Sequence, residues 1–525
     1  MTRADGTSRL AGLRSAFAAL QAGDFAGCAD TLQGAAASDG DAALLRGLAL
    51  AGLGQAAHAA ALLATLAEAN PAAAHPAADL LPLLARHGRG AALDAYLRAA
   101  LHRSPAEPRL LAIAADHARR QGDPAGARAL LERAGDALPA RIALASLLAE
   151  QGETAEAIAQ LRALAAGPGE RSAALWSNLG VALGVEGRFP EADHAFATAR
   201  TLRPDDARIA MNHGMAVLKS GRLAAGWPDF NRRLTLPGHM LLPAERLVPP
   251  GAALRGRHVL VTHDSGYGDT LQFARYLPLL LAAGATVSLW VKPALRRLLA
   301  AHFPAIAVFD DWAARPAYDW HCPIMRLAEV FGTTPATIPP APALRPPGDL
   351  TRLWAARLPA SPRRIGLVWA GSARAHDPEL ALVDRRRSLD PAVLAPLLRV
   401  PGVTWISLQH GSTAAPAALP GLHDPMPQVH DFADTAAITA SLEAVVSVDS
   451  AVAHLAASLG RPVFLLDRLD HCWRWSWGQE DTAWYPGLRI FRQTRWGDWS
   501  GPVSRVALAL AAPAAASART APTGA

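Results

Sequence analysis

The sequence predicts an α-solenoid followed by two Rossmann-like α/β lobes, and two observations lead to this fold class. Alanine-rich helical segments repeat about every 34 residues up to residue 240. Beyond residue 250, short β-branched runs alternate with helical segments, a pattern typical of parallel sheets. The length of 525 residues suggests about three domains.

Glycines that end successive helices set the period of the repeat. They stand 34, 34, 30, 35 and 34 residues apart, at Gly54, Gly88, Gly122, Gly152, Gly187 and Gly221. A proline follows four of them by 17 residues, at Pro71, Pro105, Pro139 and Pro204. This is the tetratricopeptide period, and its clearest copy covers residues 173–206. The alternative is an alanine-rich bundle without repeats, but chance seldom produces paired glycine and proline periods.

Proline and glycine clusters divide the chain into expected domains. These are a tetratricopeptide solenoid over 1–240, an N-terminal Rossmann-like lobe over 251–334, a Pro-rich interlobe linker over 335–362 and a C-terminal Rossmann-like lobe over 363–511. Residues 512–525 are rich in alanine, proline and threonine, and we expect them to be disordered.

Composition excludes several classes of function. The net charge is only +6 and the cations do not form runs interleaved with aromatic residues, so we do not expect nucleic acid as a partner. Three cysteines are too few for a disulfide framework or a zinc knuckle. No apolar stretch is long enough to span a bilayer, and we expect a cytoplasmic protein. Every cation except Lys219 and Lys292 is an arginine, so we expect arginine to bind any phosphate.

A glycine turn follows the first predicted strand of the N-terminal lobe. Residues 264–270 read DSGYGDT and include Gly266, Gly268 and Thr270. The third glycine of a dinucleotide fingerprint is replaced by Leu271, which argues against NAD. The turn presents Asp269 at the start of a helix, at the strand ends where ligands of open α/β sheets bind. Asp269 is therefore a candidate catalytic carboxylate, a helix N-cap, or both.

A second helix start follows a predicted strand of the C-terminal lobe. Asp449, Ser450 and Ala451 begin this helix, whose N–H groups would bind an anion such as a diphosphate. His454 lies one turn further on, where it either faces the cleft or is simply a packed helical histidine. Gly371 and Gln409 each follow another predicted strand, and we expect both at the same cleft edge.

These two segments and the solenoid together resemble the tetratricopeptide-repeat glycosyltransferases of GT-B fold. The sequence is similar to the ADP-heptose:lipopolysaccharide heptosyltransferases of glycosyltransferase family 9. In architecture it is similar to the O-linked N-acetylglucosaminyltransferases and to the repeat-bearing transferases that modify flagellin. The resemblance covers nearly the whole chain and implies an α-solenoid followed by a GT-B module.

The resemblance also implies roles for the residues of the two segments. Asp269 would be the general base, while Asp449, Ser450, Ala451 and His454 would contact the nucleotide-sugar. Where heptosyltransferases have a phosphate-binding lysine, residues 384–389 read DRRRSL, so Arg387 would take this role with Arg385 beside it. A solvated charge cluster is the alternative for these arginines.

We therefore expect an inverting glycosyltransferase that needs no metal and no other cofactor, because no Asp-x-Asp occurs in the C-terminal half. Asp269 would accept the proton of an acceptor hydroxyl as the nucleotide diphosphate leaves. The expected acceptor is a serine or threonine of a polypeptide in the solenoid groove, with flagellin as one case. The alternatives are a glycan or lipopolysaccharide acceptor, and a scaffold with a degenerate, inactive GT-B module.

Overall fold

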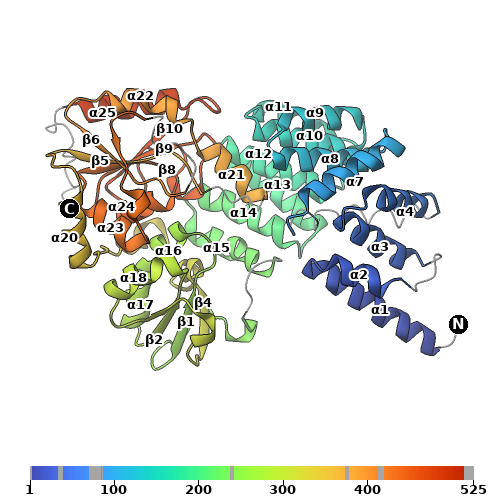
Figure 1. The fold of residues 1–525 in the computed structure, drawn as a ribbon, viewed down its shortest axis with the longest axis horizontal. Coiled ribbons are helices and arrows are strands. Elements are labelled where there is room, and N and C mark those ends of the chain that lie inside the picture. Colours follow the sequence, from blue (N-terminus) through green and yellow to red (C-terminus); the bar gives the residue numbers. More distant parts are fainter. Residues whose placement is uncertain are drawn as a thin grey trace. The chain divides into compact units, whose positions relative to one another are not determined.

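The computed structural model describes residues 3–33, 39–69, 84, 87–236, 242–372, 378–411 and 419–512 (Figure 1). The chain forms two compact units. One consists of Met1–Glu170 with Arg374–Val383, and the other of Arg171–Ala373 with Asp384–Ala525. The predicted helical array and the predicted parallel sheets are both confirmed. Pro71 and the tail 513–525 lie outside the described residues, and the sequence-based domain limits stay predictions.

The first unit is a series of helices. Its helices are α1 (Arg3–Ala22), α2 (Phe25–Thr31), α3 (Gly40–Gly52), α4 (Ala56–Ala69), α7 (Gly90–Arg103), α8 (Pro108–Gln121), α9 (Pro124–Arg133), α10 (Leu138–Glu150) and α11 (Thr154–Ala165). Gly122 and Gly152 both have φ of 88°, a left-handed conformation that favours glycine and ends a helix. This left-handed conformation is the physical reason why glycine recurs at the predicted turns.

The array continues into the second unit with four more helices. These are α12 (Ala173–Val185), α13 (Phe189–Leu202), α14 (Ala207–Lys219) and α15 (Leu223–Asn231), followed by the 3₁₀ turn η2 (Arg232–Thr235). Trp227 of α15 is fully buried, and its ring centroid lies 5.2 Å from that of Trp473 and 6.1 Å from that of Phe273. The last array helices therefore share a hydrophobic core with the sheets of this unit.

The first sheet is parallel and has the strand order β3-β2-β1-β4. Its strands are β1 (His258–Thr262), β2 (Thr286–Trp290), β3 (Ala307–Phe309) and β4 (Trp320–Pro323). The helices α16 (Tyr267–Phe273), α17 (Leu277–Ala282) and α18 (Pro293–His302) connect the first three strands. The catalytic candidate Asp269 thus lies on the connection that leaves the carboxyl end of β1.

The second sheet is also parallel, with the order β10-β9-β8-β5-β6-β7. Its strands are β5 (Arg364–Val368), β6 (Thr404–Ser407), β7 (Leu422–His423), β8 (Ala444–Val448), β9 (Val463–Asp467) and β10 (Leu488–Arg492). Its helices are α22 (Ala395–Leu398), α23 (Phe432–Ala440), α24 (Ala451–Ser458) and α25 (Ser500–Ala511). Helix α21 (Pro378–Arg387) follows β5 and is divided between the two units at Asp384. Helices cover both faces (Figure 1), which explains why β8 is buried along its whole length.

Part of the predicted linker is helical. Residues Gly348–Arg357 form α20, and its Leu350 and Trp354 are buried in the core of the second unit. The proline-rich segment that precedes α20 contains only a short 3₁₀ turn at Pro335–Thr337. Across the described residues, no helix combines the length and the apolar character needed to cross a membrane.

We predict that Trp227→Ala lowers the free energy of unfolding of the second unit by about 3–5 kcal/mol, because it leaves a large cavity between α15 and the sheets. Urea denaturation followed by tryptophan fluorescence and circular dichroism measures this loss. Trp176→Ala, at a half-buried tryptophan of α12, is the control and should cost less. Equal midpoints for Trp227→Ala and the unchanged chain would contradict a shared core.

Candidate functional site

The two segments singled out in the sequence lie against each other in the structure. Helix α16 follows β1, helix α24 follows β8, and the two helices pack together. A Cβ atom on Gly268 would lie 2.7 Å from His454 Cδ2 and 3.4 Å from Ala451 Cα, so the contact requires glycine. The approach brings the carboxyl edges of both sheets to one place, where ligands of parallel sheets bind.

Asp269 is the third residue of α16, and both of its carboxylate oxygens have partners. Oδ2 accepts the N–H of Gly266 at 2.7 Å, and Oδ1 pairs with Arg474 Nη2 at 2.5 Å. The N-cap residue of α16 is Gly266, three residues before Asp269. The interpretation of Asp269 as the N-cap is therefore wrong. Asp269 instead accepts a hydrogen bond from the backbone N–H of that N-cap residue.

The environment of Asp269 keeps its carboxylate ionised. Burial alone would raise its pKa, but the charge of Arg474, the N–H of Gly266 and the side chain of Ser265 outweigh burial and hold the pKa below its ordinary value. A base must be unprotonated before it acts, and Asp269 meets this condition at neutral pH. The same partners also weaken its affinity for a proton.

Arg474 is a site residue that the sequence did not single out. It lies in the 3₁₀ turn Trp473–Trp475 and stacks 4.2 Å from the ring centroid of Trp473. Its Nε donates to Gln272 Oε1 at 2.6 Å, and its Nη2 binds Asp269. One guanidinium therefore joins the loop after β9 to α16. Its position between two tryptophans was the only sequence signal that could have marked it.

His454 is a packed, neutral side chain beside the glycine turn. It is 5% exposed, its Nδ1 lies 3.1 Å from the Tyr485 hydroxyl, and its ring stacks on Trp475 with centroids 5.2 Å apart. Burial and the nearby Arg474 charge lower its pKa to about 4. At neutral pH the imidazole can therefore offer or accept a hydrogen bond but carries no charge.

Arg387 lies beside the start of α24. Its Nη1 donates to the carbonyl oxygen of Asp449 at 3.0 Å, and its guanidinium pairs with Asp384. A Cβ atom on Gly371 would collide with this guanidinium, so glycine leaves the room that Arg387 occupies. Arg385 is exposed on the same helix.

The first turn of α24 presents backbone N–H groups at this position. Ser450 is the N-cap residue, but its hydroxyl lies 2.9 Å from the Ser447 hydroxyl and makes no capping bond. N–H groups without a side-chain cap favour an anion. Arg387 and the start of α24 together form a candidate phosphate site.

Gln409 lies at the same edge as Gly371, but its amide binds the protein backbone. Its Oε1 accepts the N–H groups of Trp369 and Ala370 at 3.1 and 2.9 Å, and its Nε2 donates to the carbonyl oxygen of Ala370 at 3.1 Å. The amide thus fixes the loop after β5, on which Gly371 lies. It supports this edge of the site through the backbone.

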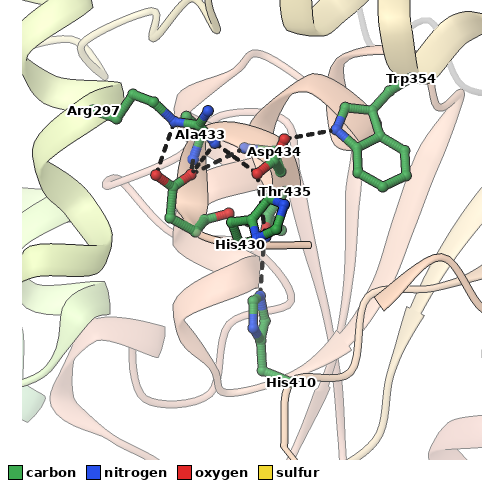
Figure 2. Close-up of polar contacts among 8 residues, drawn as sticks. Arg297, Trp354, His410, His430, Ala433, Asp434 and Thr435 are labelled. Atoms are coloured by element: carbon green, nitrogen blue, oxygen red, sulfur yellow. Dashed lines mark hydrogen bonds and ion pairs between the residues drawn. The ribbon is translucent and has the colours of Figure 1, made fainter. Parts of the chain in front are cut away.

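A second polar cluster joins the helices of the two sheets (Figure 2). Arg297 of α18 binds Asp431 through both Nε and Nη2, at 2.9 and 2.8 Å, and reaches Asp434 at 2.6 Å. Trp354 donates to the other oxygen of Asp434 at 2.9 Å. This cluster and the Asp269–Arg474 pair hold the two sheets together at different points.

Within the described part of the chain, no group of three or more histidine, cysteine or acidic side chains is arranged to hold a metal ion. The candidate site comprises the Asp269 carboxylate, the guanidinium groups of Arg387 and Arg474, the neutral His454 imidazole and the start of α24.

We predict that Gly268→Ala destabilises the second unit by about 1–3 kcal/mol, because the new methyl group would push α16 away from the packed His454 ring. Thermal unfolding followed by circular dichroism measures the effect. Gly487→Ala is the matched control, since a Cβ atom there meets nothing within 4 Å. An unchanged melting temperature for Gly268→Ala would show that the two helices are not in this contact.

Comparison with known proteins gives one curated relative and several solved structures, and no family model matches the chain. Protein FlbA of Caulobacter vibrioides is 27% identical over 448 residues, which cover 70% of this chain and 72% of FlbA.

Two of the similar solved structures are transferases. The ADP-heptose lipopolysaccharide heptosyltransferase II of E. coli is 15% identical, covers 48% of this chain and 98% of its own, and has a TM-score of 0.34. The O-GlcNAc transferase of Thermobaculum terrenum is 18% identical, covers 79% and 91% of the two chains, and has a TM-score of 0.27. Both transferase classes to which the sequence is similar are thus among the solved structures that the chain matches.

Proposed function

We propose that this protein is a glycosyltransferase that moves a sugar from a nucleotide-sugar to an acceptor hydroxyl. The two parallel sheets would be the Rossmann-like lobes of a GT-B module, with the reaction at the edge where α16 meets α24. The observation that carries the proposal is the contact of Gly268 with Ala451 and His454, which puts a candidate base beside a candidate phosphate site.

In this proposal the donor binds to the second sheet. Its phosphate would lie against the first turn of α24 and the guanidinium of Arg387, which the Asp449 carbonyl oxygen holds in place. Arginine suits this task because its planar guanidinium can bind phosphate through two parallel hydrogen bonds. The charge of the leaving group would be met by these groups, and we propose that no metal ion is needed.

Asp269 would act as the base of a single, inverting displacement. The acceptor oxygen attacks the anomeric carbon, the bond to the donor phosphate breaks, and the hydroxyl proton passes to Asp269. A carboxylate oxygen can accept two hydrogen bonds, so the bonds to Gly266 and Arg474 leave room for an acceptor hydroxyl.

The proposed acceptor is a serine or threonine of a polypeptide bound by the helical array. Repeated helix pairs offer long concave surfaces that suit an extended chain. Repeat-bearing transferases that this sequence resembles modify flagellin, so flagellin is the first polypeptide to test. A glycan acceptor remains the alternative if no polypeptide is modified.

We predict that Asp269→Asn lowers the turnover number by roughly 10²–10⁴-fold while the donor Kd changes little. Hydrolysis of the donor and transfer to flagellin measure turnover, and calorimetry measures the Kd. Asp390→Asn, which changes an exposed helix-start aspartate, is the matched control. Full turnover in Asp269→Asn would rule out the base assignment, and no turnover in the unchanged chain would favour an inactive scaffold.

We predict that Arg387→Met weakens binding of the donor by about 1.5–3 kcal/mol, the usual value for hydrogen bonds to charged groups. A thermal-shift screen of UDP-, GDP-, ADP- and CMP-sugars first selects the donor, and calorimetry then gives the Kd. Arg385→Met on the exposed side of α21 should have a much smaller effect. Turnover should persist in EDTA, and strict dependence on Mn²⁺ or Mg²⁺ would contradict the proposed donor site.

A further inference from the structure

The glycine turn holds a second buried carboxylate that the proposed mechanism does not use. Asp264 follows β1, and only 6% of its side chain is exposed. Its Oδ2 pairs with Arg233 Nη2 at 2.6 Å, while no residue in the described ranges donates a hydrogen bond to the buried Oδ1. Burying a carboxylate oxygen without a hydrogen-bond donor lowers the stability of the fold. The presence of this carboxylate beside a candidate base therefore needs a physical reason.

The partner of Asp264 comes from the end of the helical array. Arg233 lies in the turn η2, directly after α15, and stacks 4.3 Å from the ring centroid of Phe230. Its guanidinium also donates to Asn231, whose Nδ2 in turn donates to Glu329 at 2.7 Å. The guanidinium that binds Asp264 is therefore held in one position by the array and by the first sheet.

Two guanidinium groups and one thiol lie near the two carboxylates of this turn. Arg233 and Arg474 supply two positive charges, and Asp264 and Asp269 supply two negative charges. Burial, with the added charge of Asp269, raises the pKa of Asp264 to about 6 although Arg233 opposes the shift. Burial raises the pKa of the Cys322 thiol to about 12, so this neighbour stays neutral.

A negative charge next to Asp269 has a direct chemical effect. Arg474 weakens Asp269 as a base because it stabilises the carboxylate, whereas a neighbouring anion strengthens the base because it favours protonation. We propose that Asp264, fixed by Arg233, is a positioning residue that keeps Asp269 basic enough to accept the acceptor proton. This inference rests on the proposed role of Asp269, and it makes the end of the helical array part of the catalytic machinery.

The test measures donor hydrolysis by the full-length chain between pH 5 and 9, with the nucleotide-sugar that gives the largest shift in the thermal screen. The variants are Asp264→Asn, Arg233→Met and the double variant Arg233→Met with Asp264→Leu, which removes both buried charges together, and circular dichroism checks that each of them folds. Arg200→Met is the matched control, because it breaks a 2.8 Å ion pair with Asp229 on the same array helices. Asp269→Asn serves as the reference for loss of the base.

For the unchanged chain we expect kcat to fall as the pH drops through about 6, because protonation removes the negative charge of Asp264. Asp264→Asn lacks this charge at every pH, so its kcat should be about 10-fold lower at pH 8 and should show no step near pH 6. The donor KM should stay within about twofold, since the donor lies on the other sheet. Asp264→Asn leaves the Arg233 charge unpaired, whereas the double variant removes both charges, so the kcat of the double variant should lie between those of Asp264→Asn and the unchanged chain and show no step near pH 6. Arg200→Met should match the unchanged chain.

Two results would overturn the inference while leaving the proposed function intact. One is an Asp264→Asn variant with the kcat and pH profile of the unchanged chain, or a double variant that keeps the step near pH 6, when Asp269→Asn is inactive. The other is a loss of kcat that Arg200→Met shows to the same extent. Normal hydrolysis by Asp269→Asn would instead overturn the proposed function, and the inference with it.

Discussion

The arrangement of the second unit depends on how two buried carboxylates at one turn are neutralised. Asp264 and Asp269 lie five residues apart in the sequence, and each pairs with an arginine from a distant segment. Arg233 comes from the end of the helical array and Arg474 from the loop after β9. An unpaired buried charge costs several kcal/mol, so the turn keeps this conformation only while both segments are in place.

This constraint explains why the last array helices belong to the unit that contains the sheets. Trp227 and Phe230 fill the core between α15 and the first sheet, and Arg233 follows them directly in the chain. Apolar packing supplies the stability, and the ion pair fixes the orientation. A cut just before residue 241 would therefore remove core side chains as well as a partner of the turn.

Local sequence patterns were sufficient to predict the helices, the buried strands and the turn glycines, because each has a cause within a few residues. The contact between the segments of Asp269 and His454 was not predicted, because the two segments follow strands of different sheets. The pairs Arg233–Asp264 and Arg474–Asp269 were not predicted either, because they join residues 31 and 205 positions apart. Among 49 arginines, Arg474 is distinguished only by its position between two tryptophans, and nothing in the sequence marks Arg233. Gln409 was placed at the correct edge, but its hydrogen bonds to the backbone depend on a loop conformation that spacing does not specify.

The central claim is that a donor site on α24 and a base on α16 face each other across the contact at Gly268. A crystal structure of the full-length chain with its nucleotide-sugar tests this claim most directly. We expect the donor phosphate against Arg387 and the first turn of α24, with the anomeric carbon facing Asp269 and room for an acceptor oxygen between them. A donor bound elsewhere, or one whose anomeric carbon is shielded from Asp269, would contradict the account.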